Sequence, residues 1–148
     1  MKTEIRLTGH KNLMSWLSKH GEDTKNDVKK MIFRTGNDIR TEAMRNLERN
    51  GTSKTRKLKQ SIQHITVKSG YGGEVFSGLD TSEFIEYGTK PHWIKIKHKK
   101  VLANVKTDEI FGKKVFHPGT KPKPFMAPAA HKHLTKLTND LLALMRER

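Results

Sequence analysis

The fold is decided by residues 22–50, which read EDTKNDVKKMIFRTGNDIRTEAMRNLERN. Apolar and small side chains recur in this stretch at spacings of three and four, and charged residues occupy positions between them. This pattern is typical of an amphipathic helix whose buried stripe consists of Val28, Ile32, Thr35, Ile39, Ala43 and Leu47. Acidic residues at its start suit the helix dipole, and Asn50-Gly51 predicts its end. A helix of this length spans roughly 40 Å.

Two more helices are predicted on either side of this one. Residues 127–147 place leucines at helical spacing, and Pro128 sits in the first turn, where a missing N–H is tolerated. Leu13, Trp16 and Leu17 predict a shorter helix that stops at Gly21. Inside the long helix, Gly36 costs up to about 1 kcal/mol relative to Ala, so the helix needs tertiary support.

Shorter elements fill the segments between the helices. Weak alternation over residues 3–7 predicts an edge strand, and residues 51–57 are polar and basic, typical of an exposed loop. We expect residues 59–89 to form a hairpin followed by a short helical turn. Its parts are a strand at 61–67, a turn at 70–73, a returning strand at 74–77 and a helical turn at 81–87 that ends at Gly88.

Residues 90–123 are predicted to form an extended basic arm or loop. Alternating side chains indicate strands at 92–98, at 101–105 and near Phe111 to Phe116. Pro118, Pro122 and Pro124 hold the chain extended at the end of this segment. A connection this long without its own core is usually functional or disordered. We therefore expect the arm to project and to be poorly ordered in an isolated protomer.

Composition bounds the class of protein. The chain has 148 residues, a formal net charge of +15 and only 33% hydrophobic residues, which predicts one domain over 1–148 with a thin core. We expect an α+β fold: a small antiparallel β-sheet packed against a long N-terminal helix and a C-terminal helix, with an extended basic β-arm.

No apolar run is long enough for a membrane span, and the absence of cysteine excludes disulfides and thiol catalysis. The first seven residues lack a signal peptide's apolar segment, so folding in a cytoplasm is expected.

No catalytic or metal site is predicted, and no cofactor is expected. The chain has eight histidines, but His131 and His133 are two apart and would point to different faces of a helix. The acidic residues are spread out; Glu83 and Glu86 lie three apart but have no recognisable catalytic partner. The glycines at 70–73 belong to a hairpin turn rather than to a phosphate-binding loop.

Basic clusters are the remaining signal for a binding surface. Alternating lysines on a strand share one face, which suits contact with a phosphate backbone, although a solubilising face would have the same pattern. A pI of about 10.1 favours an acidic partner, and charge alone does not choose among nucleic acid, an acidic protein and an anionic lipid surface. The candidate DNA- or partner-facing residues are Lys54, Arg56, Lys57 and Lys59; Lys95, Lys97, Lys99 and Lys100; and Lys113 and Lys114.

Three stretches, in this order, carry a family resemblance: TRKLKQSI at 55–62, FIEYGT at 84–89 and VFHPGTKPKPFMAPA at 115–129. Together they resemble the tail-component family of long-tailed phages named for the tenth gene product of phage HK97. The resemblance covers roughly residues 22–145. One departure is Arg56, which stands where the family commonly has glycine.

The resemblance implies a structural role in a virion neck. Family members act in head–tail joining or tail completion, which implies as partners the head connector, the tail terminator, copies of the chain in a ring, and passing double-stranded DNA. The implied location is the head–tail interface of a virion assembled in the bacterial cytoplasm. The alternative is a small basic protein that binds nucleic acid without sequence specificity. The motif residues expected to have structural roles are Leu58, Ser61, Glu86, Tyr87, Gly88, Thr89, His117, Pro118, Gly119, Pro124, Phe125 and Pro128.

Overall fold

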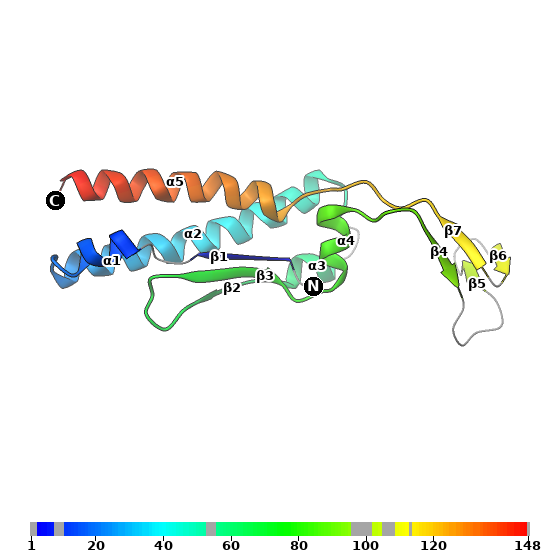
Figure 1. Cartoon of the computed structure of the whole chain (residues 1–148), viewed down its shortest axis with the longest axis horizontal. Coiled ribbons are helices and arrows are strands. Elements are labelled where there is room, and N and C mark those ends of the chain that lie inside the picture. The colour runs from blue at the N-terminus through cyan, green and yellow to red at the C-terminus, as the bar shows by residue number, and fades with distance from the viewer. Residues whose placement is uncertain are drawn as a thin grey trace.

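Two long helices, α2 (Glu22–Arg49) and α5 (Met126–Glu147), lie side by side along the molecule (Figure 1). The computed structural model describes residues 3–7, 11–52, 56–95, 102–104, 109–112 and 114–147. The predicted stripe of α2 is buried along its whole length. Its first half packs with the short helix α1 (Lys11–Leu17) and the end of α5, and its second half packs with the start of α5.

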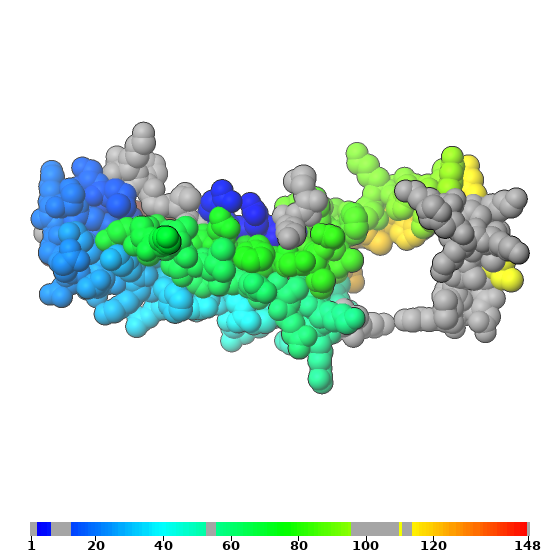
Figure 2. All heavy atoms as spheres, turned by 90° about the horizontal axis from the view of Figure 1, so that it is seen from below, coloured from blue at the N-terminus to red at the C-terminus, as the bar shows by residue number. Residues whose placement is uncertain are grey.

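A three-stranded antiparallel sheet covers the helices. The strands β1 (Glu4–Leu7), β2 (Ile62–Thr66) and β3 (Gly73–Ser77) are ordered β1-β3-β2. Ile5 and His64 both lie opposite Val75, so these three side chains share the face that meets α2. Seen from below, the β2–β3 hairpin runs along α2, with α1 at one end of the molecule (Figure 2). The predicted α+β fold is confirmed.

The structure differs from the sequence prediction just before β2. Residues Arg56–Gln60 form a short helix, α3, in a segment that we expected to be an exposed loop leading straight into the hairpin. The helical turn directs Leu58 into the core, where it is 3% exposed, while Arg56 and Lys57 stay in solvent. Ser61 ends the turn by donating hydrogen bonds from its amide to Lys57 O and from its hydroxyl to Leu58 O. A single buried residue leaves no periodic signal in sequence.

Beyond α4 (Thr81–Tyr87) the chain forms two separate strand pairs. β4 (His92–Lys95) pairs with β7 (Lys114–His117), and β5 (Leu102–Asn104) pairs with β6 (Glu109–Gly112). Figure 1 shows these strands beyond the ends of α2 and α5. The intervening residues 96–101, 105–108 and 113 lie outside the described residues, so the strands expected at 92–98 and 101–105 are described only in part. The ordering of the arm in an isolated protomer stays a prediction.

Candidate assembly site at the base of the arm

The arm leaves and re-enters the body at two glycines that face each other. Gly88 has a φ of 71° and Gly119 a φ of 83°, values that other residues rarely adopt. A Cβ on Gly88 would overlap the carbonyl oxygen of Thr120, and a Cβ on Gly119 would overlap that of Thr89. The outgoing and returning segments of the arm can therefore approach this closely only because neither glycine has a side chain.

Thr89 and Thr120 join these two segments by an antiparallel bridge. Each backbone amide donates to the carbonyl oxygen of the other residue at 3.0 Å, and the two hydroxyl oxygens lie 3.1 Å apart. Next to this bridge, Gly119 N–H donates to His117 Nδ1 at 3.0 Å. Two backbone bonds, which do not depend on side-chain rotamers, thus hold the base of the arm, and the threonine hydroxyls and the His117 ring add side-chain contacts.

A buried carboxylate connects α4 to the start of α5. Glu86 Oε2 accepts hydrogen bonds from the backbone amides of Phe125 at 2.8 Å and Met126 at 2.9 Å, and Oε1 accepts one from Ala127 at 2.9 Å. Pro128, the next residue, has no N–H to satisfy. One side chain, only 2% exposed, therefore satisfies every free donor of this helix end, where the helix dipole also favours a negative charge.

The segment before α5 is fastened to α2 as well. Asn46 Nδ2 donates to Phe125 O at 2.9 Å, and Asn50 Nδ2 donates to Pro124 O at 3.0 Å. Lys123 N–H donates to Ile85 O at 2.8 Å, and the Phe125 side chain is fully buried in the core. The three residues that precede α5 are consequently tied to α2 and α4.

Aromatic side chains on the arm and at its base remain exposed. Trp93 and Phe116, on opposing strands, meet edge-on with ring centroids 5.1 Å apart, yet they are 55% and 50% exposed. Phe84 on α4 is also more than half exposed. It lines an open groove of about 720 Å³ between α4 and the arm strands, together with Ile85 and Ile94. Such uncovered apolar surface is typical of a protein contact site.

The structure brings only some of the motif residues together. Those at the base of the arm are Glu86, Gly88, Thr89, His117, Gly119, Phe125 and Pro128. Leu58 and Ser61 lie elsewhere, at the α3–β2 junction, where the Ser61 hydroxyl is 2.8 Å from that of Ser77. Tyr87, Pro118 and Pro124 are exposed. The α5 helix begins at Met126, so Pro128 is its third residue and lies in its first turn.

The predicted basic residues do not form one described surface. Arg56 and Lys57 are exposed on α3, whereas Lys59 forms an ion pair with Glu48. Lys95 and Lys114 face each other across β4 and β7, and the Lys114 ammonium lies 4.0 Å from the Trp93 ring centroid. The other candidates, Lys54, Lys97, Lys99, Lys100 and Lys113, lie outside the described residues.

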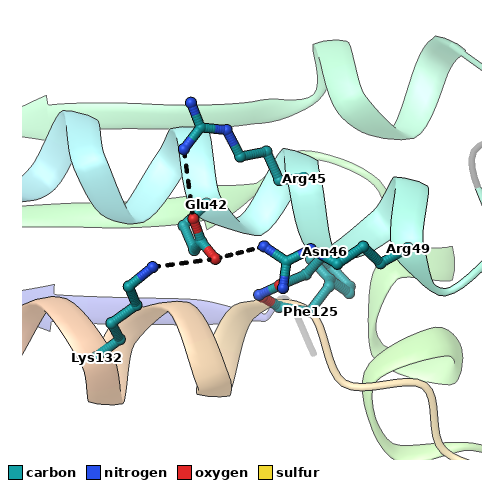
Figure 3. A network of polar contacts seen from close by, with 6 residues as sticks. All are labelled: Glu42, Arg45, Asn46, Arg49, Phe125 and Lys132. Carbon is teal, nitrogen blue, oxygen red and sulfur yellow. Dashed lines mark hydrogen bonds and ion pairs between the residues drawn. The ribbon is translucent and has the colours of Figure 1, made fainter.

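Sequence reasoning missed a charged network between α2 and α5 (Figure 3). Glu42 is 7% exposed and contacts three cations: Arg49 at 2.6 Å, Lys132 at 3.5 Å and Arg45 at 3.6 Å. The hydrogen bond from Arg49, followed by the charge of Lys132, lowers the pKa of the Glu42 carboxyl below its usual value. One feature of the sequence could have indicated this network: a glutamate beside the apolar stripe, followed by arginines three and seven residues later.

Within the described ranges, no group of three or more histidine, aspartate or glutamate side chains is placed to hold a metal ion. Among the described helices, none has the length and apolar character needed to cross a membrane.

One comparison with known proteins produced a match. The family model described as "Bacteriophage HK97-gp10, putative tail-component" matches residues 11–88, more than half of the chain. Neither the curated proteins nor the solved structures gave a significant match.

Proposed function

The chain belongs to the HK97-gp10 tail-component family of bacteriophages, and from this premise we propose that it is a structural protein of the virion neck. In this proposal it completes the tail or joins it to the head connector, as part of a ring around the DNA channel. Its partners are the head connector, the tail terminator and further copies of itself. The family is structural, and no enzymatic step is part of the proposed role.

The observation that supports this proposal most is an arm whose described strands lie away from the body, which holds it at its base. An isolated two-stranded ribbon is marginally stable in water. The β4–β7 ribbon nevertheless lies beyond α2 and α5 (Figure 1). Its Trp93 and Phe116 side chains are half exposed. Each of these side chains is already about half buried, so covering the rest contributes on the order of 1 kcal/mol, and a partner surface would both stabilise the ribbon and gain affinity from it.

A ring follows from docking of this arm on a neighbour. The arm and the surface it meets are different parts of the chain, so the contact is heterologous, and such contacts close into rings when the rotation allows. The clamp formed by Gly88, Thr89, Gly119 and Thr120 fixes where the arm leaves the body. We expect the arm to gain order as neighbours arrive.

Complementation of a phage that lacks this gene tests the proposal. We expect electron micrographs of the lysate to show separate heads and tails, and we expect wild-type protein to restore joined particles. The double substitution Trp93→Ser/Phe116→Ser should reduce joined particles about tenfold, because it removes two apolar contacts worth on the order of 1 kcal/mol each. Leu142→Ser, which alters a side chain of similar exposure (47%) on α5, is the matched control and should complement.

Two results would contradict the proposal. One is intact, infectious virions in the absence of the protein. The other is a tight complex between the monomer and a short DNA duplex at physiological salt, seen by light scattering and lost as salt rises. The second result would instead support the free nucleic-acid-binding protein.

A further inference from the structure

The surface around Glu42 carries more positive charge than its carboxylates can balance, because the neighbouring Glu48, whose pKa is lowered by its hydrogen bond with Lys59 and also by the charge of Arg45, is itself paired with Lys59. Arg45 and Arg49 on α2 and Lys132 on α5 converge on the buried Glu42 carboxylate, which leaves a local surplus of two positive charges (Figure 3). The three cationic side chains are 63–64% exposed, whereas Glu42 is 7% exposed. The anion is inside and the cations face the solvent.

The three cations are not equally engaged. Arg49 makes a hydrogen bond of 2.6 Å to Glu42, but Arg45 and Lys132 remain 3.6 Å and 3.5 Å away. These longer contacts orient the two side chains and leave most of their N–H donors free for another acceptor. Both helices are rigid here, because α2 and α5 pack directly against each other. The helix backbones therefore need no rearrangement when an anion binds, and the entropy lost is that of the exposed arginine and lysine side chains.

The surroundings of the cluster favour a phosphate ligand over a protein. Among the described residues of α2 after Phe33 and of α5 before Leu142, no large hydrophobic side chain is exposed. Protein interfaces usually have an apolar centre, whereas DNA interfaces are more polar and strongly cationic. Arginine forks also match the geometry of phosphate oxygens. Arg45 and Arg49 are four residues apart, about 6 Å along the helix axis, so they present two adjacent donors.

We propose that Arg45, Arg49 and Lys132 bind backbone phosphates of double-stranded DNA, and that the α2–α5 face carrying them turns toward the DNA channel. This inference rests on the proposed neck function for its setting. It separates two basic surfaces by role: the arm contacts protein neighbours through its aromatic side chains, and the Glu42 cluster contacts passing DNA. The contact carries no sequence information, as backbone contacts do not.

The test measures binding of the full-length protein to a fluorescent 20-base-pair duplex by anisotropy, at low salt and then across a salt series. Arg45→Gln/Lys132→Gln keeps the Arg49–Glu42 bond and should fold. We expect its affinity to fall about tenfold or more and its salt slope to fall by about 2. Lys25→Gln/Lys30→Gln removes the same charge from two cations at the other end of α2, each also paired with a carboxylate. This control should lose less than about threefold.

A second variant changes binding in the opposite direction. Glu42→Gln removes the competing carboxylate and should raise DNA affinity about threefold or more, whereas the loss of one negative charge elsewhere on the surface should give a smaller gain. Glu22→Gln, which also frees one lysine from an ion pair, is its control and should change affinity less. Circular dichroism checks that each variant is folded.

Equal losses for the two double variants would overturn the proposal, since binding would then follow net charge alone. Cluster variants that bind duplex normally but fail to join heads and tails would also overturn it and point to an acidic protein ligand. The DNA-binding assay does not depend on the proposed neck function. If the cluster binds DNA but the protein is dispensable for joining heads to tails, the DNA site is supported and the neck role is refuted.

Discussion

Single side chains at the base of the arm hold together segments that are distant in sequence. Glu86 is the main example, because its carboxylate accepts hydrogen bonds from three backbone amides some forty residues away. The residue is almost completely buried. Its partners are main-chain groups, which exist in every sequence, so no pattern of residues could have predicted this role. The FIEYGT motif marked the residue, and only the fold shows what it does.

We predict that Glu86→Gln lowers the free energy of unfolding by about 2–3 kcal/mol. An amide in place of the carboxylate turns an NH2 toward at least one backbone donor, and hydrogen bonds to a charged group contribute about 1.5–3 kcal/mol. Urea denaturation measures the change. Asp80→Asn, at the exposed start of the same helix, forms no side-chain cap and should change stability by less than about 0.5 kcal/mol. Equal effects of the two substitutions would refute the capping role.

At the scale of elements, the long helix illustrates both what sequence predicts and what it leaves out. The stripe of α2 was predictable because helical periodicity is a local property of the chain. Gly36, by contrast, looked like a cost inside that helix. The structure shows its purpose: the His64 ring from β2 occupies the place where a Cβ would be, which lets the sheet approach the helix closely.

We therefore predict that Gly36→Ala destabilises the protein by about 1–3 kcal/mol, although Gly→Ala usually stabilises a helix by about 1 kcal/mol. In a His64→Ala background, where the ring is absent, the same substitution should become neutral or stabilising. Thermal or urea unfolding of the four proteins in this double-mutant cycle measures the coupling. A destabilisation of the same size in both backgrounds would show that His64 is not the reason for the glycine.

Other elements were not predictable for reasons that are equally physical. The five-residue helix α3 buries one side chain, too few to show a period. The Glu42 network requires α5 to lie on α2, a long-range arrangement that the charges of α2 alone do not reveal. The arm was predicted as extended and basic, but its strand pairing, Trp93 opposite Phe116, depends on the crossing at Gly88 and Gly119.

For the molecule as a whole, the exposed aromatic side chains and the Glu42 cluster lie in different regions. Residues 90–123 contain ten lysines and two acidic residues. The net charge of this segment, +8, is more than half of the +15 of the whole chain. The exposed aromatic side chains Trp93 and Phe116 lie in the same segment, whereas the Glu42 cluster lies on the paired helices of the body. This division suits a neck protein, which must bind neighbouring proteins while DNA passes beside it.

Cryo-electron microscopy of the neck in purified virions tests the proposed neck role. We predict a ring of copies of this chain around the DNA at the head–tail junction. In this ring each β4–β7 ribbon should lie against the neighbouring copy, and the α2–α5 face bearing Arg45, Arg49 and Lys132 should line the channel. A neck whose density contains no copy of the α2–α5 pair, in virions from which the protein is absent by mass spectrometry, would contradict it.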